Sequence, residues 1–303
     1  MKQIIILCAT QRCGSTMIVD DFRSSKVLGL PEEYFIPWTK HQLDDPIRNF
    51  KGILNRASTD NGVATIKVMA DQLEHIESNL AAIGFCSEEE QVEGYLPHCK
   101  KLFQGAKFVR VDRLDSVSQA VSRYMAVQTG KNHLVDASAD YVPGNSTDSN
   151  RNYNDAVRLD SSKLDEFVIS IAKEKSIWDR ALRAWDETPL EYLVYEECML
   201  NRDYVSAICN KLGIELNQLG ERQLKKIGNA NNDVMVNDYA KESYTSKMKS
   251  IEAYTNQIRD VGFSLIGTHN LAALTLLKVV KKIRPNSPAV AQKIRELSTN
   301  EQK

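Results

Sequence analysis

The chain has 303 residues, of which 42% are hydrophobic and 26% charged, so it can bury a full core. This composition excludes disordered, collagen-like and coiled-coil proteins. Lys and Arg total 39 against 40 for Asp and Glu, so no global positive field is available to hold a nucleic-acid backbone. At about 150 residues per domain the length allows two domains, although α/β enzymes often reach it as one.

Residues 4–9 form an apolar, β-branched run that resembles the start of a secretion signal. The run is shorter than the roughly 7 to 15 residues of a signal-peptide core and leads into a polar glycine turn. We therefore expect a strand, a cytoplasmic location and no transmembrane segment. The cysteines lack CxxC or zinc-ligand spacing, which indicates free thiols in a reducing compartment. They are Cys8, Cys13, Cys86, Cys99, Cys198 and Cys209.

Strands and helices alternate along the next part of the chain. Apolar runs without alternation are typical of strands covered on both faces, and each of the first three leads into a segment with helical spacing. The predicted strands are residues 4–9, 63–69, 107–111 and 191–195, and the main helices are residues 71–83, 115–127 and 162–185. This order predicts an α/β fold with a parallel sheet flanked by helices.

Two polar stretches and an amphipathic tail complete the chain. Residues 142–154 are rich in Asn, Ser, Asp and Gly, which predicts an exposed loop and a candidate lid, and residues 228–233 are similarly polar. Residues 247–303 are expected to form a helical extension, amphipathic from 265 to 284, where Pro285 and Pro288 break it. We expect this extension to pack on the first 246 residues or on a partner subunit in a homodimer, in preference to a membrane surface.

The first strand is followed by a glycine turn and then a helix. Such a turn directs unpaired backbone N–H groups into one concavity at the positive end of the helix dipole, which suits a phosphate. The motif G-x-x-x-x-G-K-[ST] is absent, because Ser15 stands after Gly14 where the lysine would be. Arg12, Ser15 and Thr16 remain as candidate anion ligands; the alternative is an ordinary capped helix with a surface arginine.

Two further segments carry candidate functional groups. Glu32 and Glu33 are adjacent carboxylates that could act in acid–base chemistry, although a solvated acidic turn is the alternative. After the third strand, an arginine precedes a helix on which Ser118 and Ser122 share a face, which predicts a second anion site. Two anion sites at one sheet edge suit a ligand with two separated phosphates.

The motifs TQRCGST, PEEYF and RLDSVSQAVSRYMAVQTG resemble those of the trehalose 2-sulfotransferase family, bacterial enzymes that use 3′-phosphoadenosine 5′-phosphosulfate (PAPS). The resemblance extends from about residue 4 to about residue 239, with weaker landmarks around Lys67 and at Tyr195-Glu196. It implies a P-loop-like sulfotransferase fold over residues 1–246, PAPS as donor and adenosine 3′,5′-bisphosphate (PAP) as product. The acceptor would be a hydroxyl of a carbohydrate or a small metabolite.

The resemblance also implies residue roles. Arg12 would contact the leaving phosphate and Glu33 would be the general base. Arg113 and Ser122, with Ser118 as a substitute, would hold the 3′-phosphate; Arg110 with Ser118 is the alternative pair. The residues that would bind the 5′-phosphosulfate are Gln11, Arg12, Cys13, Gly14, Ser15 and Thr16.

The chain departs from the family where an arginine-rich segment would precede the C-terminal family helix. It has Asn229-Ala230-Asn231-Asn232-Asp233 there, so Lys225 or Lys226 would have to supply the positive charge. No metal is expected, because the five histidines are isolated. The alternatives are a phosphotransferase with an irregular phosphate loop, which would need the absent GK[ST] lysine, and a nucleotide-binding module without catalysis.

Overall fold

The computed structural model describes residues 3–88, 94–136, 139–149 and 151–300. The chain divides into two compact units, residues 1–236 and 237–303. Each unit is described by itself.

The first unit is built on a four-stranded, all-parallel sheet with the order β2-β1-β3-β6. The strands are β1 (Gln3–Ala9), β2 (Val63–Met69), β3 (Lys107–Asp112) and β6 (Glu191–Val194). Ala9 is paired with Met69, and Asp112 with Val194, so the carboxyl ends of neighbouring strands meet at one edge. The predicted α/β fold with a parallel sheet is confirmed.

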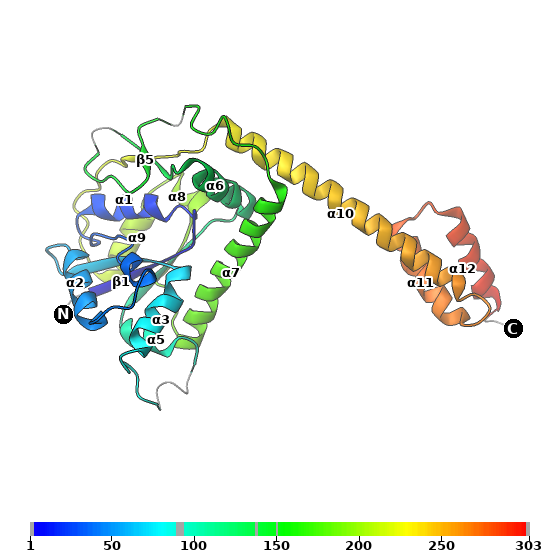
Figure 1. Ribbon diagram of the computed structural model, residues 1–303, viewed down its shortest axis with the longest axis horizontal. Helices are drawn as coiled ribbons and strands as arrows, with labels where there is room; N and C mark the ends of the chain where they lie inside the picture. Colours follow the sequence, from blue (N-terminus) through cyan, green and yellow to red (C-terminus); the bar gives the residue numbers. More distant parts are fainter. Residues whose placement is uncertain (1–2, 89–93, 137–138, 150, 301–303) are drawn as a thin grey trace. The chain divides into compact units, whose positions relative to one another are not determined.

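Burial on both faces of the sheet explains the apolar run in β1. Along β1, Ile6 and Cys8 pack into one core and Ile5, Leu7 and Ala9 into the other. The first core is covered by α3 (Leu73–Ala81), α5 (Pro97–Leu102) and α7 (Ser161–Trp185), and by α2 (Pro46–Arg56), which the sequence patterns did not reveal. The second is covered by α1 (Ser15–Ser25) and α9 (Asp203–Leu212) (Figure 1).

A second, smaller sheet lies in the same unit. It has the order β5-β4-β7, with β4 (His133–Val135) parallel to β5 (Ser146–Thr147) and antiparallel to β7 (Leu224–Lys225). In the same unit, α6 (Ser116–Thr129) follows β3, and the short α8 (Tyr195–Cys198) follows β6.

The described part of residues 142–154 is largely irregular and exposed or half-buried, as expected, but its end is held to the second polar stretch, residues 228–233. Residues 142–154 contain β5, and Asn154 is only 1% exposed. Its Nδ2 donates to Oδ1 of Asn229 (3.1 Å) and of Asn232 (3.0 Å), which lie at the start of α10 (Ala230–Ser264). Amide side chains have both donors and acceptors, so they satisfy one another when buried.

The second unit is helical. After α10 come α11 (Asn270–Ile283) and α12 (Pro288–Asn300). Helix α11 ends before Pro285, as expected, and Pro288 begins the next helix, a position that proline tolerates. Leu274, Leu277 and Val280 pack against α12 and the end of α10, whereas Leu271 is 70% exposed. Among the helices that the structure describes, none is both long and apolar enough to span a membrane.

Candidate functional site

The turn between β1 and α1 can be made only with glycine at residue 14. Gly14 has a φ of 90°, and a Cβ there would lie 2.2 Å from Cδ2 of Tyr195. The aromatic ring is thereby packed directly on the turn. The amides of Ser15 and Thr16, in the first turn of α1, have no acceptor within the helix, so they present positive partial charge at this edge of the sheet.

Arg12 lies in the same turn, with a φ of 63°. Its Nε donates to Oγ of Ser122 (3.1 Å) and its Nη2 to the carbonyl of Asn132 (2.7 Å). Burial lowers the pKa of Arg12 below its usual value, and none of the described carboxylates pairs with it. A guanidinium held by neutral groups in a partly buried place keeps its charge available for an anion.

A second group of polar side chains lies at the end of β3. The Arg113 guanidinium lies 4.8 Å from the centre of the Tyr195 ring and 3.9 Å from Oε1 of Glu196. Ser118 donates its hydroxyl to Asp115 (2.5 Å), the N-cap of α6. Arg113, Ser118 and Ser122 all line the same cavity as Arg12.

Arg110 is placed differently from Arg113. It is 1% exposed, and its Nη2 lies 3.4 Å from Asp112 and 3.5 Å from Asp179. It does not line the cavity. The positive charge of Arg110 is therefore paired with Asp112 and Asp179 and is not directed into the cavity.

Glu33 and Glu32 point to different surroundings. Oε1 of Glu33 lies 2.8 Å from Nζ of Lys67, which is also 3.4 Å from the Thr16 hydroxyl, and both Glu33 and Lys67 line the cavity. Glu32 instead accepts from the Tyr141 hydroxyl (3.1 Å) and does not line the cavity. The backbone amide of Lys67 donates to the Glu32 carbonyl (3.1 Å), and this hydrogen bond fixes the backbone of the two adjacent glutamates against β2.

Gln11 and Cys13 complete the turn. Gln11 lines the cavity, with its amide donated to Glu174 (3.0 Å) and its carbonyl accepting from Gln119 (2.7 Å). Cys13 is fully buried in the core, and its amide donates to the Thr10 carbonyl (3.3 Å). The Cys13 side chain therefore packs on the core side of the turn and does not line the cavity.

The cavity has a volume of about 660 Å³, within the range usual for small-molecule sites. Its acidic lining residues are Glu33 and Asp233. Its basic lining residues are Arg12, Lys67, Arg113, Arg123, Arg222, Lys225 and Lys226. This excess of positive charge contrasts with the near-neutral chain and produces a local field that attracts anions.

The sequence assigned no site role to several lining residues. Lys67, a charge inside an otherwise apolar strand, and Tyr195 were named only as weaker landmarks of the family resemblance. His133 gave no signal: it faces the cavity from a three-residue strand, and burial, with the nearby Arg12 and Lys67, lowers its pKa to about 3. Its imidazole is therefore neutral near pH 7. Within the described part of the chain no cluster of His, Cys, Asp and Glu could hold a metal ion.

Comparison with known proteins agrees with this arrangement. No curated protein matches the sequence, but the sequence profile of the Stf0 sulphotransferase family matches residues 4–242. The match spans the parallel sheet from the second residue of β1 onward and every residue named above in the cavity. The chain therefore belongs to the Stf0 sulphotransferase family, as its motifs predicted.

Proposed function

We propose that this sulfotransferase takes its sulfuryl group from PAPS and transfers it to a hydroxyl of a carbohydrate or a small metabolite. The observation that carries the proposal is one cavity lined by two groups of basic and hydroxyl side chains and by a carboxylate. The groups are the turn around Arg12 and the residues around Arg113, and the carboxylate is that of Glu33.

The 5′-phosphosulfate would bind at the N-terminus of α1. Arg12 and the amides of Ser15 and Thr16 supply positive charge there, and Gly14 lets the backbone approach the ligand. Gln11 contributes its side chain to the wall, and Cys13 holds the turn from the core. The anion would replace water at groups that are already fixed, which is the requirement for electrostatic stabilisation of a leaving group.

The 3′-phosphate would bind to Arg113 and Ser122; Ser118 would substitute for Ser122 only if its hydroxyl gave up the hydrogen bond to Asp115. Tyr195 supports the Arg113 guanidinium from one side, and Ser122 accepts from Arg12, so its hydroxyl hydrogen remains for a phosphate oxygen. We prefer Arg113 to Arg110 because only Arg113 lines the cavity.

The transfer would proceed by in-line displacement. The acceptor oxygen forms a bond to sulfur while the bond between sulfur and the phosphate oxygen breaks, and the proton of the acceptor hydroxyl passes to Glu33. The leaving phosphate gains negative charge, which Arg12 and the α1 N-terminus stabilise. Nζ of Lys67, which lies 2.8 Å from Oε1 of Glu33, would orient the carboxylate.

Ligand-induced stabilisation tests the choice of donor. PAP should raise the melting temperature, because it binds the folded state alone, whereas ATP with magnesium should do little. A larger rise with ATP and magnesium would contradict the proposal and favour a phosphotransferase. Mass spectrometry of acceptor mixtures incubated with PAPS would then identify the sulfated hydroxyl.

A further inference from the structure

Three basic residues of the cavity follow a segment without regular structure. Arg222, Lys225 and Lys226, here called the basic wall, lie at the end of or just beyond residues 214–223, which form neither helix nor strand. Like charges repel one another, and the pairing of the two-residue β7 with β4 is a short anchor for the basic wall. Further contacts must hold the basic wall against the cavity.

The fixing groups are on α1, the helix whose N-terminus faces the cavity. Asp20 is 3% exposed, and its Oδ2 accepts the backbone amides of Gln223 (2.7 Å) and Leu224 (3.0 Å). These amides immediately precede Lys225, so one buried carboxylate sets the position at which β7 begins.

Asp21 fixes the side chain of Arg222. It is fully buried, and its Oδ1 and Oδ2 accept from Nε (3.1 Å) and Nη2 (2.5 Å) of Arg222. The guanidinium also donates to the Cys198 carbonyl (3.0 Å). A guanidinium held in this two-point geometry cannot swing out of the cavity wall without breaking both of its hydrogen bonds to the buried Asp21, which would keep only Arg202 and the Tyr204 hydroxyl as partners.

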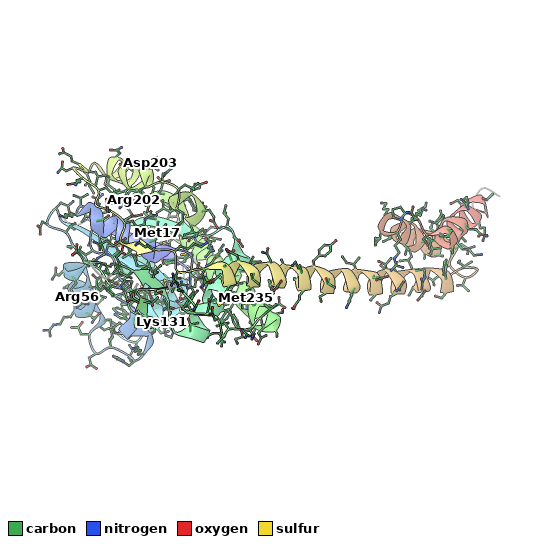
Figure 2. The ribbon with its side chains drawn as sticks, turned by 90° about the horizontal axis from the view of Figure 1, so that it is seen from above. Met17, Arg56, Lys131, Arg202, Asp203 and Met235 are labelled. Carbon is green, nitrogen blue, oxygen red and sulfur yellow. The ribbon has the colours of Figure 1, made fainter. Side chains whose placement is uncertain are left out.

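Arg202 holds the backbone at Gly220, two residues before Arg222. It forms an ion pair with Asp21 (2.8 Å) and donates to the Gly220 carbonyl (2.5 Å) and the Ser24 hydroxyl (2.8 Å). The Gly220 amide in turn donates to the Ser24 carbonyl (3.2 Å). Figure 2 marks Arg202 beside Asp203, where α9 begins, and Met17 on α1.

We propose that Asp20 and Asp21 are positioning residues for donor binding. They lie on α1 and hold the basic wall at a fixed position relative to the turn around Arg12, which precedes the same helix. This inference rests on the proposed function only for the identity of the anion. Two aspartates and two arginines balance in charge, and neither aspartate lines the cavity. Their effect on the donor must therefore pass through the segment they hold.

Asp20→Ala and Asp20→Asn test the proposal as a pair. Alanine removes the acceptor of two amides and should weaken PAP binding by calorimetry about tenfold or more, whereas the asparagine oxygen can still accept and should keep binding within about threefold. Asp45→Ala is the matched control, because it removes the cap of α2 (2.8 Å to the Arg48 amide), away from the cavity. It should lower stability without changing the affinity for PAP.

Amide hydrogen exchange separates this proposal from the proposed function, because it needs no ligand. Residues 220–226 should exchange at least about tenfold faster in Asp20→Ala than in wild type or Asp45→Ala. Arg202→Met, outside the cavity lining, should do the same if Asp20→Ala fails to fold. Unchanged exchange, or unchanged PAP affinity in a folded variant, would overturn the positioning role. A wild-type protein that does not bind PAP would overturn the proposed function, and the exchange result would still decide the role of Asp20.

Discussion

At the scale of single residues, Glu33 is the group on which the proposed proton transfer depends. Glu33→Gln should lower the turnover number by about 10²- to 10⁴-fold, as removal of a general base does, and leave PAP binding intact. Steady-state kinetics and calorimetry measure the two effects. Glu32→Gln is the control, because Glu32 contacts Tyr141 outside the cavity and should retain activity. Wild-type turnover in Glu33→Gln would exclude it as the base.

Replacement of Arg113 should chiefly affect ligand affinity, whereas replacement of Arg12 should chiefly affect turnover. Arg113→Ala should weaken PAP binding much more than binding of adenosine 5′-phosphosulfate, which has no 3′-phosphate. Arg12→Ala should lower turnover more than donor affinity, because its charge matters most while the phosphate leaves. Calorimetry with both ligands checks the first effect and kinetics the second. Equal losses for the two ligands in Arg113→Ala would refute the separation of the sites.

His133 should make the protein sensitive to acid. Its pKa falls from an ordinary 6.5 to about 3 on folding, chiefly through burial. The unfolded state therefore binds more protons between these values, and the free energy of unfolding decreases as the pH falls below 6.5, by up to about 1.4 kcal/mol per pH unit. Urea unfolding at pH 7.5 and pH 5 should show a smaller decrease in His133→Gln than in wild type. Equal decreases would contradict a buried neutral imidazole.

Sequence reasoning located residues that follow a strand end, because such residues reach the same edge of a parallel sheet. Arg12 and Arg113 were found in this way with help from the family motifs, whereas Glu33, which follows α1, was found as one of two adjacent carboxylates and from the PEEYF motif. Asn132 and His133 could not be found, since they depend on a three-residue strand paired with a distant segment. Cys13 shows the converse: its place in the turn was predicted, but the burial of its thiol follows from packing.

At the scale of elements, the turn between β1 and α1 depends on Gly14 and on the ring packed against it. Gly14→Ala should lower the free energy of unfolding by more than about 1 kcal/mol, because φ is positive and the new Cβ would overlap Tyr195. Chemical denaturation measures this effect. Gly130→Ala is the matched control, with a φ of 67° and no atom within 4 Å of its Cβ. Equal losses in the two variants would contradict the role of the Tyr195 contact.

The elements of the large sheet were predictable and those of the small sheet were not. Short apolar, β-branched runs identify the strands of the large sheet in the sequence, as the match of the fully buried β2 to residues 63–69 illustrates. The strands β5 and β7 have two residues each and contain Ser146, Thr147 and Lys225, so no periodicity can identify them. The pairing of Asn154 with Asn229 and Asn232 likewise depends on tertiary contact.

At the scale of the whole molecule, the family match and the compact units nearly coincide. The match ends at residue 242, and the first unit ends at residue 236. We retain as a proposal the division into a sulfotransferase domain, residues 1–246, and a helical extension, residues 247–303. The apolar face of α11 is covered by α12 and by the end of α10. A homodimer through the extension would therefore use other residues, such as the exposed Leu271.

The most direct test of the account is sulfuryl transfer itself. The purified protein, incubated with PAPS and a panel of carbohydrate and metabolite hydroxyl compounds, should release PAP in step with the appearance of one sulfated product, followed together by mass spectrometry. Glu33→Gln should suppress both signals and still bind PAP. Release of PAP at equal rates with and without any acceptor in the panel, or equal product formation by Glu33→Gln, would contradict the proposed transfer.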